Sequence, residues 1–503
     1  MLYTMRRLTC RPLACHTMVR GIASKVMTLD TMNQRVIKAE YAVRGRLPMR
    51  AAEIAQDLAS GAGEKYPFDQ LVFCNIGNPQ SVGQAPLTFN REVLALLTAP
   101  HLLSRADEMV SSGLMSAEAV ARAREYQSKG ASVGAYTDSA GFKFIRDEVC
   151  DMLEKRDGHR VDPGHVFLTN GASEGVRLMM TAIGASHLGG PVGIMAPIPQ
   201  YPLYSALTTL IDGELVGYYL DEDEGWAISA DCLKTSYDEA TARGINVRAL
   251  VLINPGNPSG ANLDDGTLEA VVKFAHEKGL VLMADEVYQE NVFTSHPFKS
   301  ISRVVKELGL PIELTSMHSL SKGFLGECGV RGGYAVFENF APEVIAQFIK
   351  LKSIELCSNT IGQLSVGLMV RPPIADAKLL YDTEMAAVLE GLRTRATILT
   401  ETMNRLHGIT MPEIGGAMYA FPQVELPAAA IKAAEAQGVP ADEFYCMQAL
   451  ETTGLVVVPG SGFRQQPGTF HFRTTFLPQP TSKMEKALSA FATFHREFMR
   501  KYT

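Results

Sequence analysis

Between residues 166 and 337, short runs of β-branched and apolar residues alternate with amphipathic stretches, and this constrains the fold more than any other feature. Such alternation is typical of parallel strands joined by crossover helices. The pattern predicts seven strands, at 166–169, 192–195, 215–220, 249–254, 281–284, 313–317 and 333–337. We therefore expect an α/β protein with a mostly parallel seven-stranded sheet flanked by helices.

The segments around this block predict further helices and a second, smaller domain. Helical patterns cover 105–128, 341–356 and 376–406, and the last hundred residues mix helices at 428–436, 443–451 and 481–500 with strands at 455–458 and 469–473. A chain of 503 residues is too long for one average core. We expect a separate segment at 1–28, an arm at 29–85, a large domain at 86–365 and a small α+β domain at 366–503.

Charge and cysteine content exclude several classes of protein. The net charge of −7 argues against a nucleic-acid-binding surface, which needs a basic face. The eight cysteines form no CxxC pair and no cluster at zinc spacing, so we expect free thiols and no metal site. No apolar run reaches the roughly eighteen residues of a membrane helix, so we expect no membrane span.

The N-terminal segment is basic. No acidic residue precedes Asp30, whereas five basic residues do: Arg6, Arg7, Arg11, Arg20 and Lys25. This composition is typical of a mitochondrial transit peptide, and a disordered basic tail on a cytosolic protein is the alternative. We expect the mitochondrial matrix, with a cytoplasmic form also open because Met27 or Met32 could start a shorter chain.

Four local patterns stand at the ends of predicted strands, where ligands bind in open α/β sheets. They are Asn-Gly-Ala-Ser-Glu-Gly at 170–175, Asn-Pro-Gly-Asn-Pro-Ser-Gly at 254–260, Ala-Asp-Glu-Val-Tyr at 284–288 and Ser-Leu-Ser-Lys-Gly-Phe at 319–324. Neither a dinucleotide-binding GxGxxG nor a phosphate-binding GxxxxGK[ST] loop occurs, which argues against a nicotinamide-dependent dehydrogenase.

The first pattern suits a phosphate, and the second suits a ligand oxygen. The N–H groups at the start of the helix that Ala172 and Ser173 open can bind an anion, although Ser173 could instead cap the helix. Two Asn-Pro steps hold the amide of Asn257 in a rigid turn, ready for a ligand oxygen; a turn without a ligand is the alternative.

The other two patterns place charged groups at strand ends that should be buried. A buried Asp285 needs a partner, either a protonated pyridine nitrogen or a basic side chain. Lys322, among small and apolar residues, is either a reactive amine or a lysine that extends to solvent. The positive charge of Arg331 could bind a phosphate and could also disfavour protonation of the lysine.

In order and spacing, from about Asn75 to Arg473, these patterns resemble the fold-type I pyridoxal-phosphate (PLP) dependent aminotransferases. Segments 196–204, 326–329 and 416–419 are most similar to the alanine aminotransferase (glutamate–pyruvate transaminase) subgroup. The chain departs from that subgroup at Asn78, Gln80, Ala140 and Val330, positions that bear on specificity rather than on the cofactor.

The resemblance implies a role for each matching residue. Lys322 would form the aldimine with PLP and shuttle the proton, Asp285 would pair with the pyridine nitrogen, and Tyr201 would stack on the ring; these are the expected catalytic residues. Tyr288 and Asn257 would bond the ring hydroxyl.

Further residues match the family's phosphate and substrate ligands. Those for the phosphate are Ala172, Ser173, Ser319 and Arg331, with Tyr136 reaching the phosphate of a neighbouring subunit. Those for the substrate are Gly77, through its backbone, and Arg473, through the α-carboxylate. The resemblance thus implies a homodimer with shared active sites, to which the arm at 29–85 contributes.

The activity implied is ping-pong transfer of an amino group from L-alanine to 2-oxoglutarate, giving pyruvate and L-glutamate. The partners would be small amino acids and 2-oxo acids. An aminotransferase of other amino-acid specificity, or a PLP lyase similar to aminocyclopropane-carboxylate synthase, remains an alternative because one scaffold supports several reactions.

Overall fold

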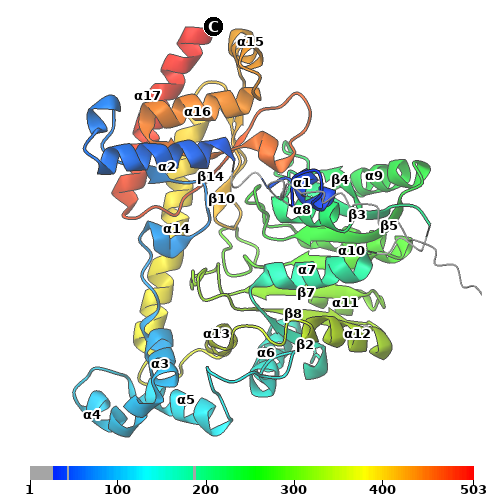
Figure 1. Cartoon of the computed structure of the whole chain (residues 1–503), viewed down its shortest axis with the longest axis vertical. Helices are drawn as coiled ribbons and strands as arrows, with labels where there is room; N and C mark the ends of the chain where they lie inside the picture. The colour runs from blue at the N-terminus through cyan, green and yellow to red at the C-terminus, as the bar shows by residue number, and fades with distance from the viewer. Residues whose placement is uncertain (1–25, 42–44, 185–188) are drawn as a thin grey trace, which may run out of the picture. The chain divides into compact units, whose positions relative to one another are not determined.

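The computed structural model describes residues 26–41, 45–184 and 189–503, in two units, Met1–Lys38 and Ala39–Thr503. The described part of the first unit holds helix α1 (Gln34–Lys38), which has no buried residue. The basic residues on which the targeting prediction depends lie outside the described residues. Every other element named below belongs to the second unit (Figure 1).

A seven-stranded sheet forms the centre of the second unit. Its strands are β2 (Val166–Thr169), β3 (Val192–Ile198), β4 (Glu214–Tyr219), β5 (Asn246–Ile253), β6 (Val281–Asp285), β7 (Leu314–Ser319) and β8 (Gly333–Glu338). Their order is β2-β8-β7-β6-β5-β3-β4, and only β8 runs antiparallel to its neighbours. The mostly parallel seven-stranded sheet predicted from the sequence is confirmed.

Helices cover both faces of this sheet, because successive strand residues point to opposite sides. Leu250 and Leu252 pack in one apolar cluster, and Val251 and Ile253 pack in another on the opposite face. The helices around the sheet are α6 (Lys143–Asp157), α7 (Ala172–Ile183), α8 (Pro202–Leu210), α9 (Ala230–Ala242), α10 (Asp265–Lys278), α11 (Ile301–Leu308), α12 (Pro342–Ser353) and α13 (Thr360–Val370).

Strand register brings the predicted site residues together. Ile253 lies opposite Asp285, and Asp285 lies opposite Met317, so β5, β6 and β7 end side by side. The loops that follow β5 and β7 carry Asn257 and Lys322. The site therefore forms at the carboxyl edge of three adjacent parallel strands.

The predicted helix at 105–128 is broken, which corrects the sequence interpretation. It forms α4 (Ala106–Ser111) and α5 (Ala117–Ser128). Gly113 has a φ of 73°, which ends the first helix, and the Ser116 hydroxyl accepts a hydrogen bond from Ala119 N at 3.2 Å, which begins the second.

The long helix α14 (Lys378–Asn404) contacts α3 (Thr88–Thr98) near one end and α17 (Thr481–Tyr502) near the other (Figure 1). The remaining helices are α2 (Arg46–Ala59), α15 (Ala428–Ala436) and α16 (Ala441–Thr453), with short 3-10 helices at Gly63–Lys65, Pro79–Val82, Pro100–Arg105, Pro163–His165 and Gly460–Phe463. The predicted helix at 428–436 is confirmed at both ends.

The C-terminal strands form small sheets. They are β9 (Ile409–Thr410), β10 (Tyr419–Ala420), β11 (Gln423–Val424), β12 (Leu455–Val456), β13 (Val458–Pro459) and β14 (Phe472–Thr475). β14 lies antiparallel between β10 and β13, and β1 (Val72–Phe73) pairs in parallel with β12. An N-terminal segment thus joins the C-terminal elements; the domain boundaries at 85 and 365 stay predictions.

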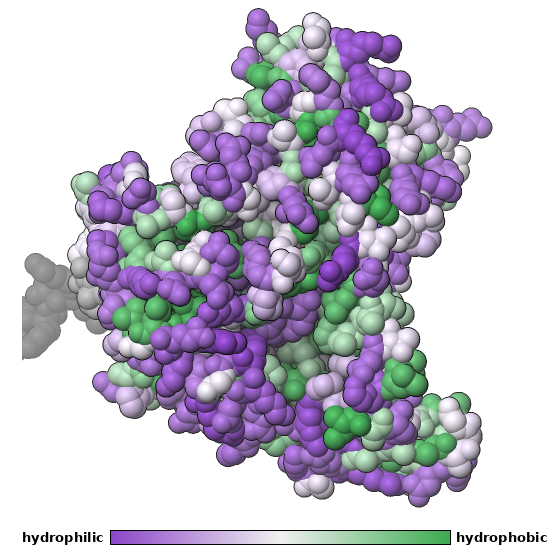
Figure 2. All heavy atoms as spheres, turned by 180° about the vertical axis from the view of Figure 1, so that it is seen from behind, coloured by the Kyte–Doolittle hydropathy of each residue, from purple (hydrophilic) through white to green (hydrophobic). Residues whose placement is uncertain are grey.

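The surface mixes polar residues with scattered apolar ones, several of which gather at the lower right of Figure 2. Within the described ranges, no helix is long and apolar enough to cross a membrane, and no group of histidine, cysteine or acidic side chains could hold a metal ion. The six described cysteines are free thiols.

Candidate active site

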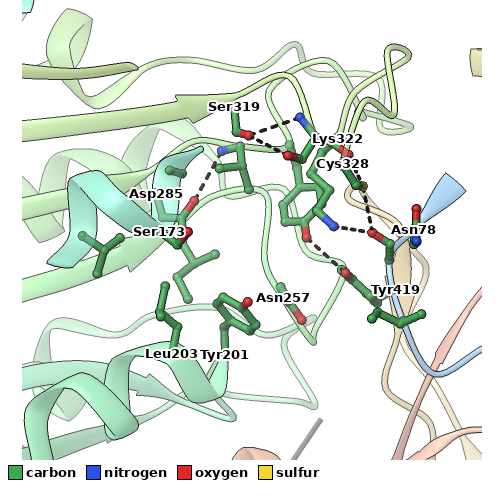
Figure 3. A pocket seen from close by; sticks show the side chains of 18 of the residues that line it. Asn78, Ser173, Tyr201, Leu203, Asn257, Asp285, Ser319, Lys322, Cys328 and Tyr419 are labelled. Atoms are coloured by element: carbon green, nitrogen blue, oxygen red, sulfur yellow. Dashed lines mark hydrogen bonds between the residues drawn. The ribbon is translucent and has the colours of Figure 1, made fainter. Parts of the chain in front are cut away.

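A cavity of about 270 Å³ lies at the carboxyl edge of the sheet (Figure 3). Its lining includes Gly77, Ala172, Ser173, Tyr201, Asn257, Asp285, Tyr288, Ser319, Lys322, Arg331 and Arg473. The structure therefore brings together every predicted site residue except Tyr136, whose side chain is 79% exposed and does not line the cavity.

Lys322 follows β7 and extends into the cavity. Its Nζ donates a hydrogen bond to the Gly77 carbonyl oxygen at 2.5 Å. A Cβ at position 77 would lie 2.9 Å from this Nζ and only 2.0 Å from the Tyr419 hydroxyl. Only glycine fits at position 77, which leaves its backbone facing the amine.

Asp285 is the last residue of β6 and only 5% exposed. The Tyr204 hydroxyl donates to one carboxylate oxygen at 2.8 Å, and the Val287 N–H lies 3.4 Å from the other. Burial raises the pKa of Asp285, which forms no ion pair with a described basic residue. A protonated ring nitrogen would supply the missing positive charge, so this end of the cavity fits the pyridine ring of PLP.

Another part of the cavity, at the start of α7, fits a phosphate. The N-cap of α7 is Gly171, with a φ of 82° and no side-chain cap, so the first N–H groups of the helix are not capped by a side chain. This corrects the alternative in which Ser173 caps the helix. Arg331 donates to the Asn170 carbonyl at 2.8 Å and to the Ser173 hydroxyl at 3.4 Å, which places its guanidinium beside the helix start.

Ser319 lies at the end of β7, close to Arg331. Its hydroxyl donates to the Ser321 hydroxyl at 3.0 Å and to the Gly332 carbonyl at 3.1 Å. Arg331 Nη1 lies 3.5 Å from the Ser321 hydroxyl. Hydroxyls, a guanidinium and helix N–H groups therefore meet at one place, a donor set suited to a phosphate dianion.

Arg473, on β14, is buried with no carboxylate partner among the described residues. Its Nη2 donates to the Asn75 carbonyl at 2.6 Å and its Nη1 to Asn257 Oδ1 at 3.2 Å, whereas Nε has no partner in the described structure. The rings of Tyr419 and Phe463 lie 4.3 and 4.7 Å from its Cζ. A guanidinium fixed between two rings suits a planar carboxylate.

Three tyrosines of the site, Tyr41, Tyr204 and Tyr419, were not predicted from the sequence. The Tyr41 and Tyr201 hydroxyls lie 3.0 Å apart, and the Tyr288 hydroxyl donates to that of Tyr419 at 3.3 Å. Burial opposes ionisation of Tyr419, but the positive charges of Lys322 and Arg473 lower its pKa overall. Tyr204 and Tyr419 lie in the segments that resemble alanine aminotransferases, so a signal existed for both; for Tyr41 we found none.

Comparisons with known proteins agree with this geometry. The family model "Aminotransferase class I and II" matches residues 108–491. A probable mitochondrial alanine aminotransferase of Dictyostelium discoideum is 47% identical over 489 residues, covering 95% of this chain and 90% of that protein. Glutamate–glyoxylate aminotransferase 1 of Arabidopsis thaliana is 43% identical over 490 residues, covering 96% and 98%.

Among solved structures, an aminotransferase from Escherichia coli superposes with a TM-score of 0.72 at 22% identity, covering 93% of this chain and 98% of that one. At this identity the superposition speaks for the fold alone.

Proposed function

The chain belongs to the class I and II aminotransferase family, and on this premise we propose that it transfers the amino group of L-alanine to 2-oxoglutarate, with PLP as cofactor. The observation that carries the proposal is a single cavity in which the Lys322 amine lies among a buried carboxylate, an anion-binding helix start and a buried guanidinium. These are the groups that a PLP aminotransferase needs for its ring, its phosphate and its substrate carboxylate.

The cofactor would be held by groups from several elements. Lys322 would hold it covalently through its amine, Asp285 through the ring nitrogen, and Asn257 and Tyr288 through the ring hydroxyl. The phosphate ligands would be Ala172, Ser173, Ser319 and Arg331. When bound, PLP supplies the electron sink that allows an amino acid to lose its Cα proton and its amino group.

The chain itself would bind and orient the substrate and move one proton. Arg473 would pair with the α-carboxylate, with the Gly77 backbone beside the substrate. Lys322 would take the proton from the substrate Cα and return it at the other end of the reaction, a role worth roughly 10²- to 10⁴-fold in rate. Tyr201 would cover one face of the ring and so hold it in the plane that the reaction requires.

The amino-group acceptor distinguishes two forms of this proposal. The Dictyostelium relative carries the name alanine aminotransferase and the Arabidopsis relative the name glutamate–glyoxylate aminotransferase, at 47% and 43% identity. We favour the alanine and 2-oxoglutarate pair because the subgroup segments 196–204, 326–329 and 416–419 resemble alanine aminotransferases. Glyoxylate is the acceptor to test against it.

The first experiment is an absorption spectrum of the purified holoenzyme before and after L-alanine, followed by 2-oxoglutarate or glyoxylate. We expect a visible band that fades with alanine and returns with 2-oxoglutarate. A band that responds only to other amino acids would mean that alanine is not the amino donor. The Lys322→Ala variant should bind PLP and yet lack turnover; preserved turnover would contradict the role of Lys322.

We further propose that two copies of the chain assemble with shared active sites. Tyr136 supports this, because a side chain 79% exposed on a loop is free to reach a second subunit. Sedimentation at low protein concentration should give a dimer, and Tyr136→Phe should weaken PLP binding without changing the mass. A monomer with full activity would contradict the assembly.

We place the protein in the mitochondrion, in line with the basic N-terminal segment and with the name of the Dictyostelium relative. Imaging of the full chain and of a chain that starts at Met32 should give mitochondrial and cytoplasmic signals respectively.

A further inference from the structure

We propose that His471 is a positioning residue for Arg473 and that hydrogen bonds to Glu222 and Gln465 hold its ring in place. The inference rests on the proposed role of Arg473 as the ligand of the substrate α-carboxylate. His471 directly precedes β14 and lies two residues before Arg473, and its side chain is 3% exposed. It does not line the cavity, so any effect on the substrate passes through other residues.

Hydrogen bonds hold both nitrogens of the His471 ring. Nε2 lies 2.8 Å from Glu222 Oε2, and Nδ1 lies 3.0 Å from Gln465 Oε1. The same Gln465 oxygen accepts the His471 backbone N–H at 2.9 Å, while the Gln465 amide nitrogen donates to Asp442 at 3.3 Å. The amide orientation is therefore set by its own partners. The imidazole is therefore held through both of its ring nitrogens.

The imidazole is coupled to Arg473 by a row of rings in contact. The His471 and Phe421 rings are parallel within 6°, with centroids 4.7 Å apart. Phe421 meets Phe463 edge to face at 5.7 Å, and the Phe463 ring lies 4.7 Å from Arg473 Cζ. A displacement of the imidazole is transmitted along this row, because neighbouring rings are in contact within a close-packed interior.

The Glu222 tether ties the row to the main sheet. Glu222 lies in the connection between β4 and α9, where Trp226 also packs against Phe421 and His471, at 5.9 and 6.0 Å between centroids. The position of Arg473 thus depends on a hydrogen-bonded pair between this connection and the residue before β14. Loss of either partner leaves a polar group of the other without its hydrogen bond.

The test uses the holoenzyme and propionate, a carboxylate shaped like alanine but without an amino group. The variants are His471→Phe, which keeps a ring for stacking, and Glu222→Gln, which keeps the shape of the side chain. The matched control is Glu224→Gln, an exposed carboxylate of the same connection. Propionate affinity is measured by calorimetry, together with KM and kcat for both substrates and the Kd of PLP.

We expect both variants to bind propionate about tenfold more weakly and to raise KM for alanine and 2-oxoglutarate alike, because a small displacement of a positioning group costs this much or more. kcat and the Kd of PLP should stay within about twofold, and the double variant should be no worse than either single one, as expected for residues of one network. Glu224→Gln should behave as the wild type.

Wild-type propionate affinity in Glu222→Gln would overturn the proposal. So would a loss of PLP affinity equal to the loss of propionate affinity, which would mean a general structural role. Arg473→Lys separates the premise from the inference: if it leaves propionate binding intact, the assignment of Arg473 fails, whatever His471 does.

Discussion

Replacing Gly77 by alanine tests the geometry of the site most directly. The new Cβ would lie 2.0 Å from the Tyr419 hydroxyl oxygen and 2.9 Å from Lys322 Nζ. Ordinary contact distances exceed the first value by more than about 1 Å. Tyr419 cannot retreat freely, because it is 3% exposed and its ring lies 4.3 Å from Arg473 Cζ.

The clash must therefore displace the lysine amine, the tyrosine or the arginine. A misplacement of about 1 Å at a reacting group costs on the order of 100-fold in rate, or about 2.7 kcal/mol. We expect kcat/KM for the alanine half-reaction to fall by that factor in Gly77→Ala when measured by stopped-flow absorption. Gly329→Ala is the control, because a Cβ there meets nothing within 4 Å.

A second substitution makes the reasoning refutable. In Gly77→Ala with Tyr419→Phe, the nearest tyrosine atom left is the ring carbon at 2.9 Å, so the required shift is a few tenths of an ångström. The fold loss in kcat/KM caused by Gly77→Ala should therefore be about tenfold smaller in the Tyr419→Phe background than in the wild type. Equal costs in the two backgrounds, or an active Gly77→Ala enzyme, would show that this contact does not govern the site.

Three further predictions concern buried charges. Tyr204→Phe removes a hydrogen-bond donor to Asp285. Because hydrogen bonds to charged groups are worth about 1.5–3 kcal/mol, PLP affinity measured by equilibrium dialysis should fall roughly tenfold to a hundredfold. Unchanged affinity would mean that Asp285 does not hold the ring. Burial raises the pKa of Asp285 above the unfolded value of about 3.9, so the stability that this carboxyl contributes to the apoprotein is lost as pH rises through its folded pKa. The Asp285→Asn apoprotein should therefore melt at a higher temperature than the wild type at pH near 7, with a difference that shrinks toward pH near 4. A difference that does not change with pH would refute this. Lys352→Met leaves the buried Glu174 carboxylate unpaired and should lower the free energy of unfolding in urea by about 3–5 kcal/mol. Glu174→Gln in the same chain should restore most of this loss. No recovery would mean that the lysine acts by packing.

The sequence was sufficient for the main sheet because buried parallel strands are short apolar runs bounded by polar turns. Each of the seven predicted strands exists, with ends that differ by up to three residues. Helix α13 (Thr360–Val370) was not predicted, because most of its residues are buried and no polar face marks its period. The strand expected at 469–473 begins at Phe472, where pairing with β13 decides the boundary rather than propensity.

Some residues of the site could be predicted from the sequence, whereas others could not. Lys322, Asp285 and Asn257 end up together because their strands are neighbours, which the alternation of strands and helices implies. Tyr204 contacts Asp285 from α8, and Tyr419 meets Gly77 from β10. Such contacts depend on how separate elements pack, which no local pattern records.

The segment after β1 contacts β14, so the proposed substrate arginine depends on residues that lie far apart in the sequence. Arg473 donates to the Asn75 carbonyl at 2.6 Å, and the Thr475 N–H donates to the Cys74 carbonyl at 2.8 Å. The segment that positions Arg473, the proposed ligand of the substrate carboxylate, is thus translated 398 residues before it. Because loop closure opposes contacts of long sequence separation, we expect this contact to form after the local contacts of the central sheet. Substrate binding would then require β14 in addition to a folded central sheet.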